Sequence, residues 1–507
     1  MNKTYYALLV SILLLPVFTS GQQQNGSVFE KRITISEKNQ TINIILDQIS
    51  WQAGVYFSYN ASILDSNKKY SIEASGKSLF TVLSKLFPAD EYKLIEIENQ
   101  VIISKVNDNK PVAEINNDTI PVKYFFLSGR ITESKKNTPV KYASVSLLNK
   151  PIGTITNSEG NFLLKIHPDF IRDTVIISNM GYAQKLIPAY TLLDEDEFVL
   201  EPISIRIKEV KIVATTPEIL LENIRKNILK NYSNESKLMT AFYRETVKQD
   251  KSYINVSEAV IEVLKAPYLN DTRSDVVRVL KGRRSPDVKP FQWLNFKLQG
   301  GPFTITKLDV VKTLESFINE ETQNLYSYQI KRVIWFQQHP VYILEFEPIE
   351  GFNENGFIGE IYVHRETFAI VHTNFRHSKS ALKNATNVLI KKKPKGVKVK
   401  PVYTNYEVNY MKYRDKWHLS NVKASVKFKV RSRNDRLNTE YHSVSDMLIT
   451  NIIDTDLKKF ERKEAFTQRD IFVETINSYD PGFWENYNII KPEEELQNAF
   501  KTKLFQN

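Results

Sequence analysis

The chain has 507 residues, no cysteine, and 69 Lys and Arg residues against 58 Asp and Glu residues, so its formal net charge is +11 at pH 7. This length allows several domains, and the absence of thiols excludes disulfides, cysteine-based zinc sites, iron–sulfur clusters and a cysteine nucleophile. A hydrophobic content of 42% with 11% aromatic residues is typical of a folded protein.

Residues 1–21 have the pattern of a secretory signal peptide. Lys3 supplies an early positive charge, residues 5–18 are mostly apolar, and Ser20 and Gly21 are small residues at which cleavage is expected. The apolar segment is shorter than the roughly 20 residues of a membrane-spanning helix, although a short N-terminal anchor is the alternative. A large exported chain without cysteine indicates a bacterial envelope protein, located in the periplasm or on the periplasmic face of the outer membrane.

Residues 29–106 alternate short strands with short amphipathic helices. Strands are expected at 31–35, 55–59, 70–74, 92–97 and 101–104. Thr41 and Ser78 are the candidate N-caps of two helices, and Gly54 marks the end of the first. The pattern predicts a small α+β domain.

The spacing of apolar residues in this segment is similar to that in a known family. The positions that carry it are Ile33, Thr34, Ile35, Thr41, Ile42, Leu46, Gly54, Val55, Phe57, Ser58, Tyr59, Leu79, Val82, Leu83 and Leu86. They resemble the secretin and TonB short N-terminal domain. The resemblance implies a periplasmic module that contacts an anti-sigma regulator in TonB-dependent transducers or stands at the front of secretins; an unrelated α+β domain is the alternative.

Residues 107–123 are polar and contain Pro111 and Pro121, which predicts a linker. The following segment, 124–213, consists of short strand-like runs between turn residues, which is typical of an all-β sandwich. These runs are 126–132, 143–148, 154–156, 161–166, 173–178 and 197–200.

Four short sequence motifs in this second segment occur in the same order as in a known family. They begin at Gly129, Pro139, Gly153 and Ser178, and the third contains Glu159-Gly160-Asn161 at an expected tight turn. They resemble the carboxypeptidase regulatory-like domain, which implies a prealbumin-like sandwich. That domain is not a peptidase, and none of the seven histidines stands in a His-x-x-Glu or His-Glu-x-x-His arrangement. A spacer or protein-contact module is expected.

Residues 215–507 predict a mainly antiparallel β domain with helical ends. Thr216 and Pro217 open a helix that ends near Asn231. Strand-like runs follow at 328–336, 341–346, 358–364, 368–373, 402–410, 416–430 and 440–449.

Two resemblances apply to this third segment. The strand–turn–strand pattern of residues 341–346 and 359–371 resembles that of the curved half-barrels that carry lipoproteins across the periplasm. The order of modules, together with Phe242-Tyr243-Arg244-Glu245 and the segment 480–487, is similar to envelope proteins of Bacteroidota.

The positive charge is concentrated in one stretch. Residues 379–436 contain 17 Lys and Arg against 3 acids, a net of 17 − 3 = +14, whereas the rest of the chain sums to 11 − 14 = −3. The densest part comprises Lys391, Lys392, Lys393, Lys395, Lys398 and Lys400. Such a run is commonly a solvated loop; as a functional patch it would attract anionic lipid headgroups or an acidic partner. Nucleic acid is not expected as a partner, because export separates the chain from it.

No residue is predicted to be catalytic, to bind a cofactor or to ligate a metal. His364, His372 and His377 are close in sequence, but a hairpin at 365–367 would place His364 and His372 about 13 Å apart along the ladder, too far to share a metal. The sequence therefore predicts a non-enzymatic interaction protein, with TonB-system, anti-sigma or outer-membrane proteins as partners, in a TonB-linked uptake or surface-sensing system. The alternative is a periplasmic carrier of a lipid or lipoprotein.

Overall fold

The computed structural model describes residues 27–59, 68–97, 99–106, 124–203, 215–268, 273–284, 297–298, 301–352, 356–392, 396–432, 437–470, 472–476 and 487–496. The predicted signal peptide (1–21) and linker (107–123) lie outside these ranges. The chain divides into two compact units, residues 1–123 and 124–507. None of the helices in the described ranges is both long and apolar enough to cross a membrane.

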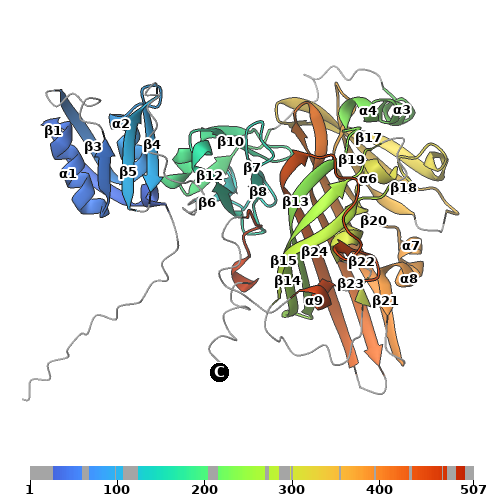
Figure 1. Ribbon diagram of the computed structural model, residues 1–507. Coiled ribbons are helices and arrows are strands. Elements are labelled where there is room, and N and C mark those ends of the chain that lie inside the picture. The colour runs from blue at the N-terminus through green and yellow to red at the C-terminus, as the bar shows by residue number, and fades with distance from the viewer. Residues whose placement is uncertain are drawn as a thin grey trace, which may run out of the picture. The chain divides into compact units, whose positions relative to one another are not determined.

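The first unit is a small α+β fold with the two predicted helices. Its elements are β1 (Arg32–Thr41), α1 (Ile42–Ala53), β2 (Tyr56–Tyr59), β3 (Lys69–Ser78), α2 (Leu79–Leu86), β4 (Tyr92–Ile97) and β5 (Gln100–Lys105) (Figure 1). β1 pairs with β3, while β2, β5 and β4 form a second sheet. The helix signals are local: Gly54 ends α1 in the left-handed region at φ +62°, and the Ser78 side chain accepts a hydrogen bond from the Thr81 N–H.

The second unit begins with the predicted β-sandwich. Its strands are β6 (Phe125–Glu133), β7 (Ser144–Leu147), β8 (Gly153–Ile155), β9 (Asn161–Ile166), β10 (Thr174–Ser178), β11 (Lys185–Pro188) and β12 (Glu197–Leu200), arranged as β11-β10-β7-β8 and β12-β6-β9. The turn before β9 needs glycine, because Gly160 has φ +80° and a Cβ there would lie 2.5 Å from the Ile131 carbonyl oxygen.

The rest of the second unit is one large antiparallel sheet, as predicted, with short helices. The helices that pack on this sheet include α3 (Pro217–Lys226), α4 (Ile228–Asn231), α5 (Gly301–Thr306) and α6 (Val310–Thr313). The strands are β13 (Lys237–Gln249), β14 (Ser252–Lys265), β15 (Val276–Arg284), β17 (Tyr326–Phe336), β18 (His339–Pro348), β19 (Phe357–His364), β20 (Ile370–His377), β22 (Val397–Tyr413), β23 (Lys416–Ser432), β24 (Leu437–Asp454) and β25 (Ala465–Phe466). Their order is β17-β18-β19-β20-β22-β23-β24-β13-β14-β15-β25.

The remaining short elements lie beside this sheet. They are α7 (Lys379–Asn384), α8 (Thr386–Leu389), α9 (Phe472–Thr475) and the strand pair β16 (Lys297–Leu298) and β21 (Ile390–Lys392). The run expected at 368–373 is displaced: β20 begins at Ile370 because Phe368 has φ +60° in the preceding turn.

The large sheet has an inner face and an outer face. The inner face packs on α3–α6 through a continuous apolar core that includes Leu220, Ile305, Val310, Phe346 and Met447. The outer face contacts the sandwich, because Ile155 of β8 packs in one cluster with Phe242, Val260 and Leu448. Alternation along the strands produces this two-sided burial.

Residues 487–496 fasten the sandwich to the outer face. The Asn488 side chain accepts from the Lys165 N–H (2.6 Å) and donates to the Lys165 carbonyl (2.9 Å), and the Ile489 carbonyl accepts from the Thr154 hydroxyl at 2.9 Å. On the sheet side, the buried Arg244 donates to the Ile490 carbonyl at 2.7 Å. One short segment thus bonds to both layers.

Replacing Asn488 with alanine is expected to lower the free energy of unfolding by about 1–3 kcal/mol, because two buried main-chain groups lose a hydrogen-bond partner. Urea unfolding of the full chain measures the effect. Glu495→Ala is the control, since the carboxylate of Glu495 is 61% exposed and its ion pair with Lys248 should contribute less than about 1 kcal/mol. Equal losses in the two variants would contradict the fastening role.

Candidate functional site

A groove of about 450 Å³ lies in the first unit between β1 and α1. Its lining residues are Ile33, Thr34, Ile35, Asp47, Gln48, Ile49, Trp51 and Gln52. The helix spacing explains the mixture of buried and exposed side chains. Ile42, Ile45, Leu46 and Ile49 form the buried stripe of α1, which leaves the face of Asp47, Gln48 and Trp51 outside the core.

The helix wall of the groove exposes a large aromatic side chain. Trp51 is 89% exposed, and Ile44, two turns earlier on the same face of α1, is 43% exposed. The exposed carboxylate of Asp47 lies between them on this face. The wall therefore offers an apolar surface with one negative charge.

The strand wall of the groove is an open edge. β3 is the partner of β1 among the described strands, so the opposite edge of β1 carries no strand. The Gln52 side chain bonds to this edge instead: its Oε1 accepts from the Thr34 N–H at 2.8 Å, and its Nε2 donates to the Thr34 carbonyl at 3.2 Å. An exposed side-chain amide thus makes the two hydrogen bonds that the backbone of a neighbouring strand would make.

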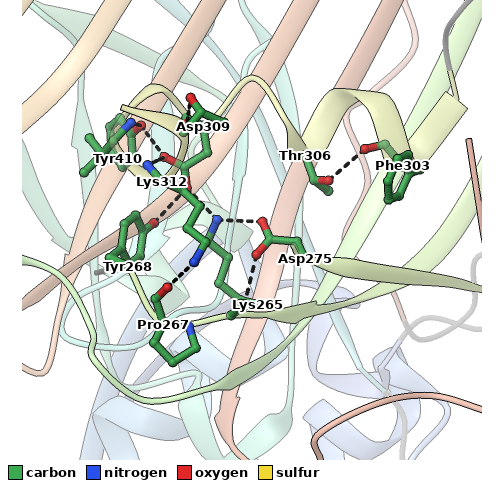
Figure 2. A network of polar contacts seen from close by, with 12 residues as sticks. Lys265, Pro267, Tyr268, Asp275, Phe303, Thr306, Asp309, Lys312 and Tyr410 are labelled. Atoms are coloured by element: carbon green, nitrogen blue, oxygen red, sulfur yellow. Dashed lines mark hydrogen bonds and ion pairs between the residues drawn. The ribbon is translucent and has the colours of Figure 1, made fainter. Parts of the chain in front are cut away.

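A second polar constellation lies in the core of the second unit, where the Lys265 ammonium bonds to two carboxylates (Figure 2). Its Nζ lies 2.7 Å from Asp275 and 2.6 Å from Asp309, and all three side chains are at most 5% exposed. Asp309 also accepts from the hydroxyls of Tyr268 (2.9 Å) and Tyr410 (2.7 Å) and caps α6 through the Lys312 N–H.

Lys265 and Asp309 shift each other's pKa. Burial raises the pKa of Asp309, but the charge and hydrogen bonds of Lys265 and the hydroxyl of Tyr410 outweigh it and hold that pKa below its ordinary value. Burial lowers the pKa of Lys265, and the two carboxylates more than reverse this effect. Because Lys265 bonds to both carboxylates and Asp309 also bonds to Tyr268 and Tyr410, the cluster joins β14, the N-terminus of α6 and β22 within the core.

A third cluster is buried on the outer face of the sheet. Glu258 accepts from Arg244 at 2.7 Å and from Arg283 at 2.9 Å. Burial raises the pKa of Glu258, yet the two guanidinium groups together bring it below its ordinary value. Nearby, the ammonium of Lys423 lies 3.9 Å from the ring centre of Tyr142 and 3.9 Å from Asp446. The contact between Lys423 and Tyr142 joins the sheet to the sandwich, whereas the Glu258 cluster lies within the sheet.

The structure describes only part of the predicted basic patch. Lys393 and Lys395 lie outside the described residues, and Lys391 and Lys392 belong to β21 with side chains that are not described. Lys398 and Lys400 are exposed on β22, and they alternate with the buried Val397 and Val399.

The three histidines considered in the sequence are separate core residues. His372 bonds to Asn409 (2.8 Å) and His377 to Thr404 (3.1 Å), whereas the His364 ring accepts from the main chain of the following turn. Burial lowers the pKa of each to about 4. In the described part of the chain, no group of three His, Cys, Asp or Glu side chains could hold a metal ion.

Sequence reasoning did not single out Trp51, Gln52 or the Lys265 cluster. One signal existed for Trp51, a large aromatic residue outside the apolar stripe of its helix. Lys265, Asp275 and Asp309 carry no motif, since up to 44 residues separate the ammonium from its carboxylates.

Comparison with known proteins identifies the sandwich. Residues 127–212 match the family model of the CarboxypepD_reg-like domain, which confirms the expectation for the second segment. No curated protein matches the chain.

Several solved structures are similar to about half of the chain. They include a putative outer membrane lipoprotein-sorting protein domain from Vibrio parahaemolyticus (11% identity, 48% of this chain and 94% of that chain, TM-score 0.24). A DUF1329 family protein from Desulfovibrio piger is 12% identical over 49% of this chain and 99% of that chain, with TM-score 0.22. A LolA superfamily protein from Nitrosomonas europaea is 13% identical over 48% and 96%, with TM-score 0.19. Similarity at these TM-scores assigns neither ligand nor partner.

Proposed function

We propose that this chain is a non-enzymatic interaction protein of a bacterial envelope, exported to the periplasm or the periplasmic face of the outer membrane. Its contact site is the groove between β1 and α1, and the occupant is an extended segment of a partner protein. The observation that carries the proposal is the pair of hydrogen bonds between the Gln52 side chain and the Thr34 main chain beside the exposed Trp51.

An extended segment fits both walls of the groove. A strand that adds to the open edge of β1 takes over the Thr34 N–H and carbonyl from Gln52, which gives affinity without sequence preference. Its side chains on one face then pack on Trp51 and Ile44, where an aromatic residue is a frequent source of binding energy. A basic side chain opposite Asp47 complements the charge of the helix wall.

The resemblance of residues 29–106 to the secretin and TonB short N-terminal domain supports the choice of partner. On this proposal the segment belongs to a TonB-system, anti-sigma or outer-membrane protein, in an uptake or surface-sensing system of the Bacteroidota type. The second unit, fastened through 487–496, then serves as a rigid body that carries the contact module.

The carrier alternative ranks second. A lipid carrier needs an apolar cavity, whereas the described inner face of the sheet is filled with side chains, such as Phe317 stacked on Phe346 at a ring-centre distance of 4.1 Å. A lipid could enter only if some of the segments packed on this face moved away from it.

Two substitutions on α1 should change partner binding in opposite directions. Trp51→Ala is expected to weaken binding of the full chain about 30-fold or more, because it removes the apolar wall. Gln52→Ala is expected to strengthen binding about 2- to 10-fold, because the incoming strand no longer displaces a side chain from Thr34.

Both residues are exposed, so neither substitution should disturb folding. The measurement is titration of the partner that co-purifies from the native envelope, with Lys85→Ala as the control, since Lys85 is exposed on α2 and does not line the groove. Losses of equal size in Trp51→Ala and Gln52→Ala would contradict strand addition, and no effect of either would contradict the site.

A further inference from the structure

A row of cationic side chains covers one end of the outer face of the large sheet. Lys398 and Lys400 of β22 lie directly opposite Arg431 and Lys429 of β23 in the strand register. Lys427 follows on the same face of β23, opposite Tyr403. We call this set of five cations the β22–β23 cationic face.

The orientation of this face is fixed by the opposite side of the same strands. Val397 and Val399 of β22 and Phe428 and Val430 of β23 are buried in one apolar cluster with Ile390. Because side chains alternate along a strand, the intervening Lys and Arg residues must point away from that cluster. Lys398, Lys400, Lys429 and Arg431 are all exposed.

Like charges stand opposite each other in two successive cross-strand pairs, Lys398–Arg431 and Lys400–Lys429. Directly opposed like charges destabilise a sheet, so this arrangement does not serve folding. On the adjoining strand β24 the corresponding positions are Asn438 and Glu440. Asn438 accepts from the Arg431 guanidinium at 3.1 Å, and Glu440 lies 3.7 Å from Lys427. Among the described residues on this face of β22, β23 and β24 there are thus five cations and one carboxylate, a net of 5 − 1 = +4.

An aromatic residue borders the cations. Tyr403 is 41% exposed, and the Lys427 ammonium lies 5.9 Å from its ring centre. A tyrosine beside several Lys and Arg side chains is the combination that membrane-surface segments present to the headgroup region.

We propose that the β22–β23 cationic face binds the surface of a membrane that contains anionic phospholipids. The broad array of like charges fits a surface of many phosphates better than a single small anion, which would need a converging pocket. This inference is independent of the groove in the first unit: it concerns other residues and another class of ligand. Of the basic patch predicted from the sequence, the face includes Lys398 and Lys400, and it adds Lys427, Lys429 and Arg431.

Co-sedimentation of the full chain with vesicles tests the proposal. Vesicles of phosphatidylglycerol and phosphatidylcholine in equal parts are expected to bind the protein, and vesicles of phosphatidylcholine alone are not. The binding should be lost when salt is raised from about 0.1 M to about 1 M, as the screening length falls from about 10 Å to about 3 Å.

The double variant Lys400→Gln, Lys429→Gln is expected to lower the vesicle affinity about 30-fold, at roughly fivefold for each charge removed. The control is Lys458→Gln, Lys459→Gln, which makes the same change of net charge at exposed positions outside the face and should leave the affinity within about twofold. Unchanged circular dichroism of the variants shows that folding is retained, and the removal of opposed like charges favours this result.

Three outcomes would overturn the proposal. One is no binding to anionic vesicles at low salt. Another is an equal loss of affinity in the two double variants, which would show that vesicle binding depends on the net charge of the protein and not on this face. The last is binding of soluble polyglutamate, weakened by the Lys400 and Lys429 substitutions, without binding to vesicles, which would assign the face to an acidic protein.

Discussion

Lys265→Met is expected to lower the free energy of unfolding of the second unit by about 3–5 kcal/mol, the usual cost of removing one partner from a buried ion pair. Without the ammonium, the carboxylates of Asp275 and Asp309 are buried without their common counter-ion, and the cap of α6 loses its support. Methionine keeps most of the side-chain volume, so the loss reports the charge and not a cavity. Urea unfolding of the full chain measures the effect.

The matched control is Lys331→Met. The ammonium of Lys331 also pairs with a carboxylate, that of Glu345, but its side chain is 52% exposed. Solvent screening limits such a pair to less than about 1 kcal/mol. A similar loss in Lys331→Met and Lys265→Met would contradict the assignment of the Lys265 cluster as a buried structural junction.

Acidification from pH 7 to pH 5 is expected to reduce the free energy of unfolding by several kcal/mol. Burial lowers the pKa of four histidines, His364, His372, His377 and His418, to about 4 from an ordinary value of 6.5. Below pH 6.5 the unfolded chain binds protons that the folded chain does not, so their contribution to stability is complete above pH 6.5 and is lost as the pH falls toward 4. Each histidine accounts for at most roughly 2 kcal/mol at pH 5.

Buried carboxylates also contribute to the pH dependence. The lowered pKa values of Asp309 and Glu258 make their stabilisation complete above the ordinary carboxylate range and remove it only as the pH falls below that range. Burial raises the pKa of Glu407 and Asp446, so these two groups oppose the loss in acid. The contribution of a single histidine between pH 6.5 and pH 5 is therefore measured by replacing that histidine.

The variant His418→Leu tests the histidine contribution. His418 is 3% exposed, and its replacement by a side chain that cannot be protonated should reduce the stability difference between pH 7 and pH 5 by at most roughly 2 kcal/mol. The measurement is urea unfolding at both pH values. An unchanged pH dependence would mean that His418 is not buried as a neutral ring.

Local signals predicted the elements of the first unit well. Ser78 and Gly54 determine helix ends through their own hydrogen bonding and φ, and such signals do not depend on distant residues. The strand β11 was not predicted, because Lys185–Pro188 is short, half exposed and closed by a proline. Short edge strands of this kind lack the apolar alternation on which prediction depends.

Pairing between distant strands could not be predicted in the large sheet. β24 lies between β23 and β13, and its register with β13 joins Lys237 to Asp454 across more than half of the second unit. The same limit applied to the basic patch: the sequence placed Lys398 and Lys400 in one run, but only the register shows that Lys429 and Arg431 lie opposite them. Likewise, the bond between Gln52 and Thr34 depends on the packing of α1 on β1.

We propose above that the groove between β1 and α1 contacts an extended segment of a partner protein. Its most direct test is site-specific crosslinking in the native envelope, with the photoreactive residue p-benzoylphenylalanine placed at position 51 and, as the control, at position 85. We expect one discrete adduct from position 51, which maps to an extended segment of the partner and becomes more abundant with Gln52→Ala. No adduct from position 51, or the same adduct from position 85, would contradict it.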